Sequence, residues 1–282
     1  MPLSKKALNR RIAIFVVVTA ALLLPVTASG GLIVHYNFEE AAGSDAIDLA
    51  GGDRPGTLIN GATQVAGGAP VNGGAQALDV SGSSNAAVDL GSGGLLQDVG
   101  GSTFAAWVKP DTFQNGERFI YRSGFNGGRS MLMAGIDGAD QPNGLPPGTG
   151  IGFQRRVFDE SGGKATLGTS ALSTGVWQHV ALSLNYQTGD WAWYIDGADA
   201  GSGVVGAWQS DPSNSTADDN GSNTLGDSSP GGNGGFSGLI DDFRLYDHAL
   251  SQAEVQALVP EPSSIILMGL GLWIMAMCRR RQ

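Results

Sequence analysis

The sequence is almost devoid of cysteine. The single cysteine among 282 residues, Cys278, lies close to the C-terminus. A scaffold of disulfide bridges within the body of the chain is therefore excluded. The body must be held together by the packing of its core, with or without a bound metal ion.

Positive charge is also scarce. The chain has 16 basic and 26 acidic residues, and seven of the basic ones lie in the two terminal segments. The body between them carries 9 basic and 25 acidic residues, a net charge of −16. Such a surface repels phosphate backbones, so we expect no nucleic acid partner. It favours solubility and the binding of cations.

Long hydrophobic runs are missing except at the two ends. The N-terminal run covers residues 12–24, follows four basic side chains and precedes the small-residue sequence Val26-Thr27-Ala28. This order is typical of a secretory signal peptide, here residues 1–28, with the mature chain beginning near Ser29. An uncleaved membrane anchor is the alternative.

The C-terminal run covers residues 265–277, between the tripeptide Pro260-Glu261-Pro262 and the arginines at 279–281. In a helix, 13 residues reach about 20 Å, which is short of the ~30 Å hydrocarbon core of a bilayer. The arginines favour the cytoplasmic side. Residues 259–282 are therefore expected to form a marginal membrane anchor with a short transmembrane helix.

The body is rich in glycine, and its apolar runs are short. The clearest pair of runs covers residues 177–186 and 190–197, where apolar side chains alternate with a period of two around a loop that contains Gly189. A capping box of Ser251 and Glu254 predicts one short helix near the end. Many short strands and few helices predict an all-β fold, an antiparallel β-sandwich.

Four stretches between Leu32 and Leu258 together resemble the laminin G-like family of concanavalin A-like jelly rolls, which places the expected domain at residues 29–258. They are LIVHYNFEE, TFAAWVKP, WQHVALSLNYQTGDWAWYIDG and GFSGLIDDFRLYDHALSQAEVQAL. The family includes lectins, hydrolases and spacers, so the resemblance implies the fold more firmly than the function.

The C-terminal segment resembles the PEP-CTERM sorting signals of exported proteins of Gram-negative bacteria, with Pro260, Glu261 and Pro262 as the sorting motif. The resemblance implies export across the inner membrane, a transient membrane anchor, and cleavage near the motif by a sorting protease of that membrane. Release to the cell surface or the extracellular matrix would follow. A permanent anchor is the alternative.

Catalytic motifs are absent. Glucanases of the related fold use an E-x-D-x-x-E run, because one carboxylate must act as the acid and another as the nucleophile or base. The sequence contains no such run, and it lacks the G-x-S-x-G and H-E-x-x-H motifs. We therefore predict no catalytic residues and no enzyme activity. The alternative is a glycoside hydrolase or lyase whose acids come from distant strands, such as Glu117 with Asp159 or Glu160.

Asp241 is the most informative carboxylate. It shares strand parity with Phe243 and Leu245, so its side chain is expected to point inward, which is costly without a charged partner. A calcium ion held by Asp241, Asp48 and carbonyls near Gly51 would supply that partner, and relatives in the family often place a structural cation where these segments meet. In the alternative, Asp241 accepts backbone N–H bonds and Asp48 makes a turn.

Aromatic rings are the candidates for ligand binding, because a ring can stack on the C–H face of a sugar. The candidates are Trp107, Trp191, Trp193 and Trp208, with core packing as the alternative for each. The predicted function is non-catalytic binding of carbohydrate, an exopolysaccharide, by an exported surface or matrix protein. A structural or adhesive domain that binds protein is a further alternative.

Overall fold

A computed structural model provides the structure of the protein, and we describe it for the following residues: 31–71, 74–92, 95–96, 99–112, 118–122, 132–137, 150–155, 164–165, 172–204, 222–227 and 235–259. Within these ranges, no helix has the length and apolar character needed to cross a membrane. The expected signal peptide, at residues 1–28, and the motif residues Pro260, Glu261 and Pro262 lie outside them.

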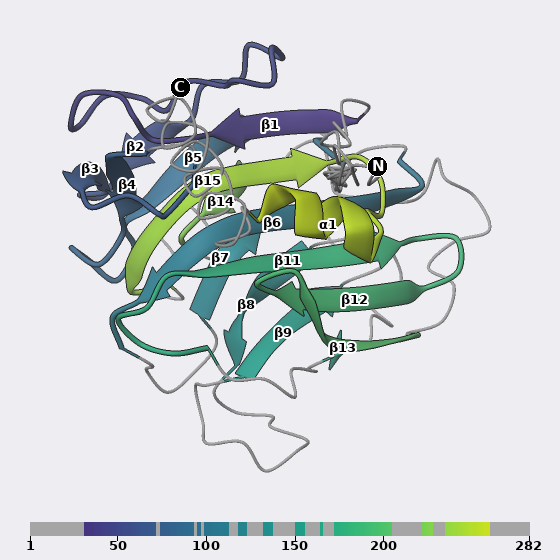
Figure 1. Ribbon diagram of the computed structural model, residues 1–282. Helices are drawn as coiled ribbons and strands as arrows, with labels where there is room; N and C mark the ends of the chain where they lie inside the picture. The colour runs from purple at the N-terminus through teal and green to yellow at the C-terminus, as the bar shows by residue number, and fades with distance from the viewer. Residues whose placement is uncertain are drawn as a thin grey trace, which may run out of the picture.

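Two antiparallel sheets form the two layers of a sandwich (Figure 1). The eight-stranded sheet runs in the order β13-β12-β11-β6-β15-β4-β3, and β1 pairs with β15 beside β4. Its strands are β1 (Leu32–Tyr36), β3 (Thr63–Ala66), β4 (Gln76–Asp79), β6 (Gly101–Pro110), β11 (Gln178–Asn185), β12 (Asp190–Ile195), β13 (Ala198–Val204) and β15 (Gly238–Tyr246).

The second sheet has seven strands in the order β10-β9-β8-β7-β14-β5-β2. Its strands are β2 (Thr57–Ile59), β5 (Ala87–Ser92), β7 (Arg118–Arg122), β8 (Leu132–Asp137), β9 (Gly150–Arg155), β10 (Lys164–Ala165) and β14 (Ser222–Leu225). The predicted antiparallel sandwich is confirmed.

The hairpin predicted from the period-two pattern is β11 and β12. Val180 lies opposite Ile195, and Leu182 lies opposite Trp193. The turn is closed by the side chain of Asn185, which accepts hydrogen bonds from the backbone N–H groups of Gln187 and Thr188. Gly189 takes a φ of +79°, a conformation that glycine adopts without strain.

Aromatic rings fill the centre of the sandwich between the two sheets. The ring of Phe104 on β6 stacks on Tyr121 on β7 at 5.7 Å and 4°, which joins the two layers. Phe243 on β15 contacts both rings and also Tyr36. Since aromatic side chains bury large apolar areas, this cluster supplies much of the core energy.

The outer face of the eight-stranded sheet is also covered. The helix α1 (Gln252–Leu258) lies across it (Figure 1), and Val255 packs on Ala105, Ala181, Tyr194 and Tyr246. The predicted capping box is present, with Ser251 as N-cap and Glu254 as its partner. A second small cluster forms where Ala69 and Val71 pack on Trp107. This sheet therefore has two buried faces.

Candidate functional site

A bulge in β15 determines where its acidic residues point. The pairing with β6 shifts between Asp241 and Arg244, and Asp242 has a φ of +46°. Ile240 and Phe243 both enter the core, whereas Asp241 lies opposite Trp107, whose ring belongs to the small outer cluster. The expectation that Asp241 points inward beside Phe243 is therefore wrong, because the extra residue of the bulge reverses the parity.

Asp241 is nevertheless buried, with 2% of its surface exposed. One carboxylate oxygen accepts a hydrogen bond from the backbone N–H of Ala69 at 2.8 Å, and the other accepts from that of Asp242 at 2.7 Å. Burial raises the pKa of Asp241 to about 7, and the charges of Asp242 and Glu39 add to the rise, while the two N–H bonds oppose it. The alternative of backbone support for this carboxylate is thus present in the structure.

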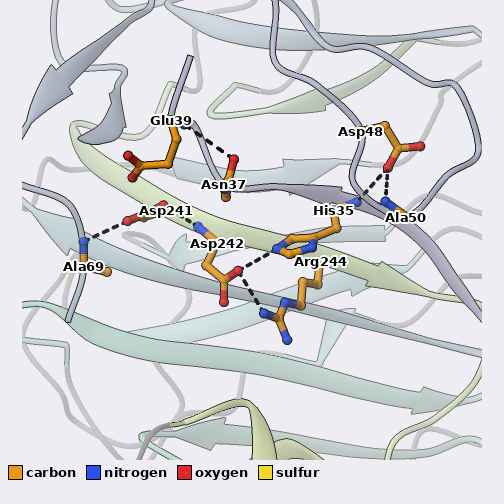
Figure 2. A network of polar contacts seen from close by, with 9 residues as sticks. All are labelled: His35, Asn37, Glu39, Asp48, Ala50, Ala69, Asp241, Asp242 and Arg244. Carbon is orange, nitrogen blue, oxygen red and sulfur yellow. Dashed lines mark hydrogen bonds and ion pairs between the residues drawn. The ribbon is translucent and has the colours of Figure 1, made fainter. Parts of the chain in front are cut away.

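Glu39 joins Asp241 at the loop between β3 and β4 (Figure 2). Its Oε1 accepts from the N–H groups of Ala75 and Gln76 at 2.8 and 3.1 Å. Three oxygens surround the position that a Cβ on Gly74 would occupy: Glu39 Oε1 at 3.1 Å, Val71 O at 3.3 Å and Asp241 Oδ2 at 3.7 Å. Glu39 and Asp241 thus approach each other beside Gly74, and each of the three oxygens also accepts a backbone N–H bond.

Asp48 belongs to a different place. Its Oδ1 accepts from the N–H groups of His35 at 3.1 Å and Ala50 at 2.9 Å, and so holds its loop against β1. Figure 2 shows Asp48 and Asp241 on opposite sides of the contact between His35 and Asp242. The structure therefore does not bring the two predicted metal ligands together. Among the described residues, no group of three His, Cys, Asp or Glu side chains could hold a metal ion, so a cation beside Asp241 would also need carbonyl oxygens.

Asp242 is the centre of an ion-pair network that the sequence analysis did not identify. Its Oδ1 lies 2.7 Å from Nε2 of His35 and 3.0 Å from the guanidinium of Arg244, and its side chain is 4% exposed (Figure 2). His35 is 207 positions away in sequence. The bulge brings these groups to one face, and the guanidinium of Arg244 together with the hydrogen bond to His35 offsets the desolvation of a buried carboxylate.

Three of the four candidate tryptophans are buried. Trp191 and Trp193 belong to the core cluster, and Trp107 is 6% exposed. Trp107 contacts His179 edge-on at 5.6 Å, and burial lowers the pKa of His179 to about 4. None of these rings has a face open to a sugar. Trp208, Glu117, Asp159 and Glu160 lie outside the described residues.

The outer face of the seven-stranded sheet carries a polar row. Thr57 lies opposite Asp89, Asp89 opposite Thr224, and Thr224 opposite Arg122. The neighbouring row is apolar and enters the core: Leu58, Val88, Leu225 and Tyr121. Thr57 is exposed and Asp89 is half-buried. Strand alternation therefore places these polar side chains on the side of the sheet away from the core, where Thr224 and Arg122 are nevertheless buried, at 0% and 8% exposed.

Comparison with protein families gives two matches. The model of the concanavalin A-like lectin/glucanases superfamily matches residues 81–256, more than half of the chain. The model of the PEP-CTERM protein-sorting motif matches residues 258–281. Both resemblances seen in the sequence are confirmed. A comparison with curated protein sequences finds no match.

Several solved structures share the fold. Domain 4 of AbnA, a GH43 extracellular arabinanase from Geobacillus stearothermophilus solved with arabinotriose, has a TM-score of 0.61 at 20% identity, over 82% of this chain and 98% of that one. The binding domain of Paraclostridial Mosquitocidal Protein 1 has a TM-score of 0.57 at 14% identity, over 82% and 52%. Trypanosoma rangeli sialidase in complex with sialic acid has 0.55 at 16%, over 81% and 32%. The chain thus spans only about half and a third of the last two.

Proposed function

Because the chain belongs to the concanavalin A-like lectin/glucanases superfamily and ends in a PEP-CTERM sorting motif, we propose that it is an exported carbohydrate-binding protein without catalytic activity. Its ligand is a polysaccharide, and its site is the outer face of the seven-stranded sheet. The sorting motif indicates export and processing at a membrane. The proposed destination is the cell surface or the extracellular matrix, after a sorting protease has removed the tail.

The polar row on β2, β5, β14 and β7 is the observation that carries this proposal. Sugars present many hydroxyl groups, and side chains that both donate and accept hydrogen bonds recognise them. Thr57 and Asp89 are the accessible members of this row, whereas Thr224 and Arg122 are 0% and 8% exposed. The opposite outer face is occupied by α1 and by the Ala69–Val71 loop. The solved arabinanase domain with arabinotriose gives a relative of the same fold that holds a sugar.

The absence of catalysis is proposed from the sequence. The acid pair that hydrolases need is not present as an E-x-D-x-x-E run. Glu39 and Asp241 are the two acids that approach each other around Gly74. Both are engaged by backbone N–H groups, and Asp241 is buried. This arrangement suits a structural cation better than an acid and a nucleophile that must reach a substrate.

We also propose that this cation is calcium, with Glu39, Asp241 and the carbonyl of Val71 as ligands. The charge of an ion would stabilise the ionised form of Asp241 in its buried position. It would also tie the end of β1 to β15 and to the loop before β4, three segments that are distant in sequence. The role of the ion would be to hold the fold and the loop in place.

The decisive experiment is a glycan array probed with the purified protein and two matched variants. Asp89→Asn changes the proposed row, whereas Asp199→Asn changes a carboxylate on β13 of the other sheet. The two aspartates share one local contact, because each accepts a hydrogen bond from the N–H two residues on at 2.8 Å. We expect binding to drop about tenfold with Asp89→Asn, the equivalent of about 1.4 kcal/mol, and to persist with Asp199→Asn.

The same array distinguishes the alternatives. Release of reducing sugar from a bound glycan would show that the protein is a hydrolase or lyase. A protein-binding function is favoured by Ile47 and Leu49, which flank Asp48 and are 58% and 50% exposed. Capture of an envelope protein that is lost with Ile47→Ser, together with an empty glycan array, would replace the carbohydrate proposal.

A further inference from the structure

The folded domain reaches up to the residue before the sorting motif. Helix α1 ends at Leu258, and Val259 follows in an extended conformation, with its N–H bonded to the carbonyl of Gln256 at 3.1 Å. The side chain of Val259 packs on the apolar cluster of Ala69, Val71, Trp107 and Trp177. No spacer therefore separates the domain from Pro260, the first residue of the motif.

This cluster exists only in the folded domain. Its members come from the loop between β3 and β4, from β6, from the segment before β11 and from the end of α1. Residues 69 and 259 are brought together across most of the sequence. An unfolded chain would leave Val259 free, so the contact reports that the sandwich has closed.

We propose that Val259 is a latch at the edge of the sorting motif, so that the sorting protease gains access to the chain before Pro260 only when the Trp107–Trp177 cluster releases Val259. The inference rests on the proposed processing of the tail. Enzymes and binding domains that take peptides commonly hold them as extended segments with residues on both sides of the contact point. With Val259 packed on the domain, the residues on the N-terminal side of the motif are not available to such an enzyme.

Two features of the cluster around Trp107 favour the release of Val259. Trp107 Nε1 and Nδ1 of the neighbouring His179 are buried without a hydrogen-bond partner in the described part of the chain. Buried polar groups without partners oppose the apolar contact that covers them. Trp177 is half-buried, at the edge of the cluster. A contact of one valine with such a cluster can hold the chain before the motif and still open.

The test follows removal of the tail in the native host by pulse-chase and mass spectrometry. Trp177→Ala weakens the latch and leaves the motif and its flanking residues unchanged. We expect processing on the order of tenfold faster, the factor that corresponds to a lost contact of about 1.4 kcal/mol. The matched control is Val176→Ala, one residue away and 53% exposed, outside the cluster. It should be processed at the wild-type rate.

A second variant tests the latch independently, in case Trp177→Ala misfolds. A Gly-Ser spacer inserted between Val259 and Pro260 keeps the latch but gives the protease free chain, and it should accelerate processing to the same degree. Hydrogen exchange of the Val259 amide in the purified protein, faster in Trp177→Ala, checks the contact without any protease. Processing at the wild-type rate in both variants would overturn the latch. A wild-type tail that is never removed would overturn the sorting proposal and the latch with it, while the exchange measurement would still report on the contact.

Discussion

The two sheets of this protein treat their outer faces differently. The central strands of the eight-stranded sheet are buried on both sides, because α1 and the Ala69–Val71 loop cover the face that does not meet the core. The polar groups on that face are closed off and bonded inside the protein, as Asp241 and Asp242 are. The seven-stranded sheet instead ends its polar row in exposed Thr57. Asp241 and Asp242 on the first sheet are therefore bonded within the fold, whereas the row on the second sheet ends in the accessible side chains of Thr57 and Asp89.

The largest effect should come from the buried histidine on the covered face. Burial lowers the pKa of His179 from 6.5 to about 4. Between these values the unfolded chain binds a proton at His179 that the folded protein does not, so the contribution of His179 to the free energy of unfolding falls as the pH drops from 6.5 to 4, whereas that of Asp241, whose pKa is raised to about 7, rises over the same range. The expected loss from His179 is about 3 kcal/mol. His179→Leu should remove this part of the pH dependence in urea unfolding.

The control for this prediction is His248→Leu, whose side chain is 40% exposed. It should keep the wild-type slope between pH 6.5 and pH 4. An unchanged slope in His179→Leu would mean that His179 titrates normally and that the covered face admits water.

A slightly smaller effect is expected from calcium at the edge of the covered face. A ligand that binds only the folded state at a hundred times its Kd stabilises that state by about 2.7 kcal/mol. For a domain of this size the melting temperature should rise by roughly 5–10 °C, at about 2–4 °C for each kcal/mol. Differential scanning calorimetry with millimolar calcium or with a chelator measures the rise.

The variants decide which carboxylates hold the ion. Glu39→Gln and Asp241→Asn should each abolish the increment, because both side chains face the Gly74 position. Asp48→Asn should preserve it, since Asp48 binds the N–H groups of His35 and Ala50 elsewhere. If Asp48→Asn alone lost the calcium-dependent rise in melting temperature, Asp48 would be a ligand of the ion, as expected from the sequence. Equal melting curves with calcium and with chelator would exclude a structural calcium ion.

Local patterns in the sequence were enough to predict the elements but not the site. The β11–β12 hairpin and the cap of α1 follow from alternation, a turn glycine and the spacing of Ser251 and Glu254, all within a few residues. The bulge at Asp242 depends on the register between β15 and β6, which are distant in sequence. Because the alternation along β15 was counted without this bulge, Asp241 was expected on the wrong face of the sheet. The approach of Glu39 to Asp241 depends on the same long-range register, and so was not predicted.

The smallest effect concerns the helix that covers the eight-stranded sheet. Ser251 and Glu254 form its capping box, with the N–H of Ser251 donating to Oε2 of Glu254 at 2.8 Å. Ser251→Ala should lower the free energy of unfolding by about 1 kcal/mol, because one N–H at the start of α1 loses its acceptor. The hydrogen bond from Ser251 holds the pKa of Glu254 below its ordinary value, so the variant should also raise that pKa, which NMR titration can follow. Ser81→Ala removes a hydroxyl from an exposed turn, where it donates to Asp79, and should stay within about 0.5 kcal/mol of the wild type. If Ser251→Ala changes the free energy of unfolding as little as Ser81→Ala does, packing on Tyr194 and Tyr246 must hold α1 on the sheet without a contribution from the capping box.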